Sequence, residues 1–127
     1  MATRSTISIE NTDGTITSVY CHWDGSPSYN GDILQNRYNY DKLAKLISNG
    51  DMSTLHGEIE HCEFYKDRGE PVRFGSYNDY YDYLKYCIFE EYNYILRLNR
   101  VWYMSKGDGY FLELPIVLEK VHNEVHS

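Results

Sequence analysis

The segment ISIENTDGTITSVYCHW, residues 7–23, predicts a β-hairpin and decides the fold class. Ile7 and Ile9 alternate with polar residues, and Thr15–Trp23 is rich in the β-branched and aromatic residues that favour strands. Between these two runs, Asp13-Gly14 is typical of a type I′ turn. The sequence DGSP, residues 24–27, then ends the second strand, because its residue types favour turns.

Short helix and strand patterns alternate along the rest of the chain. Apolar spacing predicts four helices. The first covers residues 31–38, and the second begins at an Asp41 N-cap and ends at Asn49-Gly50. The third follows a Ser76/Asp79 capping box, and the last begins at Pro115. Strands are expected over 58–65, 92–98 and 101–104. The order ββ–α–α–β–α–β–β–α predicts an α+β fold, with an antiparallel sheet built from hairpins and helices packed mainly on one face.

The length and charge of the chain exclude several classes of protein. It has 127 residues, which suits a single domain over 1–127, and a formal net charge of −7. No apolar run is long enough for a membrane span, and the start MATRSTISIE lacks a signal-peptide pattern. We therefore expect a cytoplasmic protein with three reduced cysteines and no direct nucleic-acid binding, since it has no block of Lys and Arg.

Several N-terminal motifs resemble one protein family. The opening ATRSTISIE, then DGT, the run VYCHWDG with Gly31 six residues later, and the stretch ISNGDMSTL are similar to a family of small tailed-bacteriophage proteins. The resemblance is specific over residues 2–55 and looser beyond Tyr92. It implies a phage accessory gene expressed in the cytoplasm of an infected bacterium, where many such proteins counter host defence or redirect host machinery. It supplies no catalytic residue.

The motif Cys21-His22-Trp23-Asp24 has three interpretations. Cys21 and His22 point to opposite faces of a strand, which argues against a nucleophile and base, whereas His22 and Asp24 share a face and could pair. A binding interpretation rests on Trp23 and Tyr29, which flank a Gly/Ser/Pro loop. In the purely structural interpretation, His22 or Asp24 bonds the turn backbone and Trp23 fills the core.

No metal site or cofactor is expected. His56 and His61 are five residues apart, which matches neither a helical nor a strand face. Glu58, Glu60 and Cys62 share a strand face and are more typical of a solvated acidic strip.

Half of the 14 tyrosines lie between Ser76 and Tyr94. A helix there is expected to bury Tyr77, Tyr81, Leu84 and Ile88, which leaves Tyr83 and Tyr86 on another face. Such rings suit a protein–protein surface or a homo-oligomer seam, but also a tyrosine-rich core with its hydroxyls at the surface. Alternatively they could stack on a nucleotide, whose phosphates would need cations such as Arg97 and Arg100.

Together these patterns predict a non-enzymatic phage protein that binds a host defence or regulatory protein. The candidate binding residues are His22, Trp23, Asp24, Tyr29, Tyr83, Tyr86, Arg97 and Arg100. Three alternatives remain open: a sponge for a nucleotide immune signal, an acidic mimic of nucleic acid, and a small hydrolase or nuclease that uses His22 and Asp24.

Overall fold

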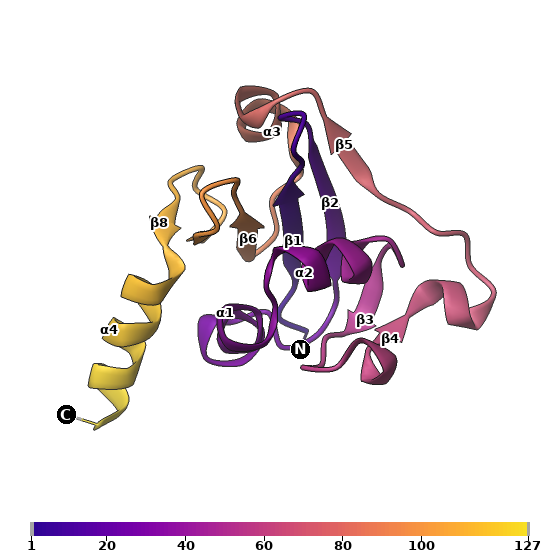
Figure 1. Ribbon diagram of the computed structural model, residues 1–127. Helices are drawn as coiled ribbons and strands as arrows, with labels where there is room; N and C mark the ends of the chain where they lie inside the picture. The colour runs from indigo at the N-terminus through magenta and orange to yellow at the C-terminus, as the bar shows by residue number, and fades with distance from the viewer. Residues whose placement is uncertain (1, 127) are drawn as a thin grey trace.

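The computed structural model describes the backbone of residues 2–126 and the side chains of residues 2–123. Within that range one sheet has the strand order β4-β3-β2-β1-β6-β7-β8, and β5 lies beside the first half of β2 (Figure 1). The strands are β1 (Ser5–Glu10), β2 (Ile16–Cys21), β3 (Met52–Thr54), β4 (Glu63–Phe64), β5 (Gly75–Tyr77), β6 (Tyr92–Leu96), β7 (Trp102–Ser105) and β8 (Leu112–Glu113).

The α+β class is confirmed, and the sheet is mostly antiparallel with two parallel pairings in the described residues. The hairpins β1–β2 and β6–β7 are antiparallel, as expected. However, β1 pairs with β6 in parallel, and β2 pairs with β3 in parallel. In both cases helices lie between the two strands in the sequence, and they carry the chain back so that the second strand runs in the same direction as the first. Ile7 on the central strand β1 therefore has Val19 on one side and Tyr94 on the other.

The first hairpin forms as predicted, but its turn is not type I′. Gly14 N–H donates to the Asn11 carbonyl (2.9 Å), and only Gly14, with φ +89°, adopts the left-handed conformation in this turn. A type I′ turn needs two left-handed residues, whereas a type I turn followed by one left-handed residue makes a three-residue loop. Asp13 instead accepts from the Thr15 backbone N–H (3.0 Å), which favours the longer loop.

Three of the four helices within residues 2–126 cover one face of the sheet. A π-helical turn, η1 (Pro27–Gly31), leads into α1 (Asp32–Arg37) and α2 (Tyr40–Ile47); α3 (Tyr80–Tyr86) and α4 (Leu114–His126) follow later. The predicted Asp41 cap is wrong, because Asn39 is the N-cap of α2 and accepts from the Lys42 N–H (2.9 Å). Pro115 lies in the first turn of α4, as expected.

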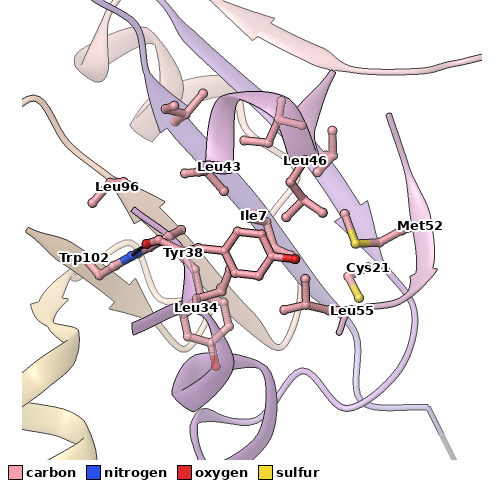
Figure 2. Packing of buried hydrophobic residues seen from close by; sticks show 14 of the residues in the cluster. Ile7, Cys21, Leu34, Tyr38, Leu43, Leu46, Met52, Leu55, Leu96 and Trp102 are labelled. Atoms are coloured by element: carbon pink, nitrogen blue, oxygen red, sulfur yellow. Dashed lines mark hydrogen bonds between the residues drawn. The ribbon is translucent and has the colours of Figure 1, made fainter. Parts of the chain in front are cut away.

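The main core lies between that face of the sheet and helices α1, α2 and α4. Ile7 and Leu96 from the sheet pack with Leu34 of α1 and with Leu43 and Leu46 of α2 (Figure 2). The Trp102 indole N–H donates to the Tyr38 carbonyl (3.3 Å), which joins β7 to the α1–α2 connection. Only every second residue of a strand points toward this core, and the residues between them form the opposite face of the sheet, against which α3 packs.

The expected strand over 58–65 is largely wrong. The chain instead makes the 3₁₀ turns η2 (Ile59–His61) and η3 (Tyr65–Arg68), with only the short β4 between them. The turn bond from Cys62 N–H to the Ile59 carbonyl (3.0 Å) takes the place of strand pairing there. The short strands β3 and β5 were not predicted, and Ser76 belongs to β5 rather than to a capping box.

Candidate functional site

The backbone of residues 23–29, here named the aromatic turn, is bonded to three strands or their immediate extensions. Trp23 N–H donates to a β3 carbonyl (3.0 Å), and Gly25 N–H donates to the Thr3 carbonyl ahead of β1 (2.9 Å). The Tyr94 hydroxyl on β6 donates to the Gly25 carbonyl (2.6 Å). The turn is therefore held in position by the centre of the sheet.

The side chain and backbone of Asn30 bind the turn from the protein interior. It is buried, and its side-chain amide donates to the Trp23 carbonyl (2.9 Å) and to the Cys21 sulfur (3.5 Å). Its backbone N–H donates to the Asp24 carbonyl (3.0 Å). Asn30 was not predicted, because a single polar residue in a loop gives no sequence signal of burial.

Two features of the backbone keep the turn tight. A Cβ added to Gly25 would lie 2.8 Å from the Thr3 carbonyl oxygen, so the close approach to β1 requires glycine here. Asp24 has φ +58°, in the left-handed region that Asp tolerates better than most residues.

The side chains of Trp23, Asp24 and Tyr29 in the turn point outward, whereas Pro27 is buried. Trp23 is 44% exposed and Tyr29 is 62% exposed, and Asp24 is exposed as well. The His22 ring meets the Trp23 ring edge-on, with centroids 4.7 Å apart. The interpretation in which Trp23 fills the core is therefore wrong, and a fixed backbone displays two aromatic rings and a carboxylate to solvent.

The predicted pairing of His22 with Asp24 does not form. The strand ends at Cys21, so the alternation of faces does not continue to Asp24. His22 Nδ1 shares a hydrogen bond with the Tyr20 hydroxyl (2.7 Å), and no bond or ion pair joins His22 to Asp24 within residues 2–126. Burial raises the pKa of Cys21 to about 12, so this thiol stays protonated near neutral pH.

The face of the tyrosine-rich helix α3 that was expected to be buried is not the face that is buried. Tyr83 is 0% exposed, whereas Tyr81, which was expected inside, is 81% exposed, and Ile88 is exposed too. Asp79, not Ser76, caps the helix by accepting from the Asp82 N–H (2.8 Å), and Tyr83 packs with Ile16 and Ile95 of the sheet. Tyr86 is exposed, as expected, but Tyr83 offers no ring to a partner.

Arg97 is engaged in the fold. Its guanidinium contacts the Glu10 carboxylate (3.2 and 3.3 Å) and lies 3.7 Å from the centroid of the Tyr80 ring. Burial alone would raise the pKa of Glu10, but the bonds from Arg97 and from the Leu98 N–H, together with the Arg97 charge, lower it. The side chain of Arg97 thus links β1 to the end of β6, and its guanidinium is already engaged within the fold.

Arg100 lies in the β6–β7 turn, where it stacks on Tyr40 of α2. Its guanidinium is 3.9 Å from the Tyr40 ring centroid and donates to the Leu98 carbonyl (3.0 Å). Neither Arg100 nor Arg97 contacts the aromatic turn among the residues described. The candidate residues therefore occupy separate surfaces instead of one cleft.

No group of three or more potential metal ligands gathers within the described part of the chain. His56 and His61 do meet, edge to face, with ring centroids 5.0 Å apart. They come together because the η2 turn folds back on itself, a geometry that spacing rules for helices and strands do not cover.

Comparison with protein-family models, with curated proteins and with solved structures finds no match. No helix within residues 2–126 has the length and apolar character needed to cross a membrane.

Proposed function

We propose that this chain is a phage-encoded, non-enzymatic binding protein that acts in the cytoplasm of an infected bacterium. Its target is a host defence or regulatory protein, and the aromatic turn is the contact surface. The resemblance of residues 2–55 to small tailed-phage proteins supports the phage origin. The structure of the turn supports the mode of action.

The observation that carries this proposal is the contrast between the fixed backbone of the turn and its exposed side chains. Trp and Tyr supply most of the energy of many protein interfaces, because they bury a large area with few rotatable bonds. Here the exposed Trp23 and Tyr29 stand on a backbone that is already bonded to β3, to β6 and to Thr3 just ahead of β1. Little conformational entropy is then lost on binding, which favours affinity.

The test is co-purification from lysate of infected bacteria, with wild type beside the double variant Trp23→Ala/Tyr29→Ala. Both residues are exposed, so we expect the variant to keep its fold and its thermal midpoint within a few degrees. Quantitative mass spectrometry should then find a host protein that the wild type retains and the variant loses. Tyr81→Ala is the matched control, because it removes an exposed ring from α3, on a different element.

Two results would contradict the proposal. One is a set of bound host proteins that does not change in Trp23→Ala/Tyr29→Ala. The other is catalytic turnover of a co-purifying substrate at substoichiometric protein, abolished by His22→Ala, which would favour the hydrolase alternative. Small-molecule extraction from the same samples tests the nucleotide alternative.

A further inference from the structure

A second surface, separate from the aromatic turn, has the character of a small-molecule site. A cavity of about 590 Å³ lies between the α1–α2 connection and the β6–β7 turn, within the usual range for ligand pockets. The buried residues Tyr38, Leu96 and Trp102 line it, and so do Tyr40 and Arg100. Six of the ten lining residues are polar or charged, and three aromatic side chains lie among them, so the cavity combines polar groups with rings and opens to solvent.

Arg100 is held in an unusual backbone conformation at this cavity. Its φ of +67° lies in the left-handed region, where a non-glycine residue costs roughly 1 kcal/mol or more. Glycine would relieve that cost, yet the position carries the side chain that stacks on Tyr40. Arg100 is exposed as a residue, so its side chain remains accessible to a ligand while it stacks on Tyr40, and guanidinium groups stack readily on aromatic rings.

The remaining lining offers hydrogen-bonding groups of both kinds. The Gln35 side-chain oxygen has no hydrogen-bond partner, but it is shielded from solvent, so a ligand in the cavity would reach this acceptor only after the side chain turns. Asp41 adds a carboxylate, and the Asn39 amide nitrogen remains a donor while its oxygen caps α2. Adjacent donors and acceptors beside a stacking surface match the edge of a nucleobase.

The charge of the lining favours a neutral ring over a polyphosphate. Arg37 is paired with Glu58, and the lining otherwise contains one cation, Arg100, and one anion, Asp41, so its remaining formal charge is balanced. We propose that this cavity binds a nucleobase, stacked on the Arg100 guanidinium and read by the polar side chains of α1 and α2. The base can come from a free nucleoside, a nucleotide or a nucleic-acid end.

The test uses ¹H–¹⁵N correlation spectra of the whole protein, which has two tryptophans and hence two indole N–H signals. Trp23→Phe assigns them, since Trp102 lines the cavity and Trp23 lies in the aromatic turn. Adenosine, guanosine, cytidine and uridine are each titrated to millimolar concentration. We expect at least one to shift the Trp102 signal saturably and to leave the Trp23 signal in place.

Arg100→Gly is the decisive variant, because glycine suits the left-handed backbone and the fold is retained. We expect its affinity for that nucleoside to fall at least 10-fold, while its thermal midpoint stays the same or rises. Arg68→Ala is the matched control, since it removes a cation that stacks on Tyr65, outside the cavity lining. It should bind like the wild type.

Further ligands identify the source of the base. The matching 5′-monophosphate and a short oligonucleotide should bind within a few-fold of the nucleoside if the base alone is recognised. Binding of ribose 5-phosphate as tight as that of the nucleotide would overturn the proposal, because the anion would then carry the affinity. It would also be overturned if no nucleoside saturates the Trp102 shift, or if Arg100→Gly binds unchanged. None of these results bears on the host-protein test, which uses Trp23 and Tyr29.

Discussion

Replacing Tyr83 tests the orientation of α3, the point where sequence pattern and structure disagree most. Tyr83 is fully buried at the centre of an aromatic cluster on the face of the sheet opposite the main core. Its ring centroid lies 5.5 Å from that of Tyr77, 5.7 Å from that of Phe89 and 6.0 Å from that of Phe111. Each such pair contributes about 0.5–1.5 kcal/mol beyond the burial of its area.

We expect Tyr83→Ala to lower the free energy of unfolding by about 3–5 kcal/mol, the usual cost of deleting a buried aromatic ring. Tyr83→Phe keeps the ring and loses only a hydroxyl that lies 3.5 Å from the Ser8 hydroxyl, a long contact, so its cost is about 0.5–1 kcal/mol. Tyr86→Ala, on the exposed side of the same helix, should change stability by about 0.5 kcal/mol or less.

The assay is urea unfolding followed by far-UV circular dichroism, with the slope of the transition compared between variants. If Tyr83→Ala does not fold, Tyr83→Leu preserves part of the packing and gives a measurable midpoint. The reasoning is refuted if Tyr83→Ala costs less than about 1 kcal/mol, or if Tyr86→Ala costs as much as Tyr83→Ala.

Three further predictions concern the sheet and its edges. Arg97→Ala leaves the Glu10 carboxylate, at a largely buried position, without its cation, and should cost about 2 kcal/mol in urea unfolding at pH 7. Folding lowers the pKa of Glu10, so the ionised Glu10 carboxylate stabilises the fold at pH values above its unfolded pKa. That stabilisation is lost as the pH falls through the folded pKa. Arg97→Ala lacks the ion pair and should therefore lose less stability than wild type on acidification. Burial raises the pKa of Tyr83 and Tyr94, so these residues should contribute their whole stabilisation below about pH 10 and lose it above that pH. The absorbance of tyrosinate at 295 nm should then rise together with the loss of circular dichroism. Gly25→Ala places a methyl group 2.8 Å from the Thr3 carbonyl oxygen and should lower stability by about 1–3 kcal/mol in a thermal melt. Under the proposed function, the same change should also weaken capture of a host protein.

The elements that sequence predicted well are those with strong local signals. The β1–β2 hairpin has alternating residues and a turn-forming Gly14, and α2 has an apolar stripe formed by Leu43, Leu46 and Ile47. Proline at the start of α4 was also a sound indicator. Each of these depends on residues a few positions apart, so no distant contact was needed to recognise it.

The elements that were missed depend on distant contacts. The strands β3 and β5 are short, and each is defined by pairing with β2 rather than by its own pattern. In α3, four of the seven residues are tyrosines, which leaves the apolar face ambiguous, and the packing of Tyr83 with Ile16 and Ile95 of the sheet decides it. The anchoring of the aromatic turn likewise joins Gly25 to Thr3 and Tyr94, which no local pattern reveals.

The parallel pairing of β1 with β6 bears on how the chain folds during synthesis. Thr6 on β1 bonds to Asn93 on β6, 87 residues later in the sequence. The hairpin β1–β2 can form as soon as it leaves the ribosome, but one edge of the central strand β1 stays open until residues 92–96 have been made. An uncovered strand edge is a template for pairing with other chains. The nascent protein is thus most prone to aggregate before β6 emerges, and a chain truncated ahead of Tyr92 would keep that edge open permanently.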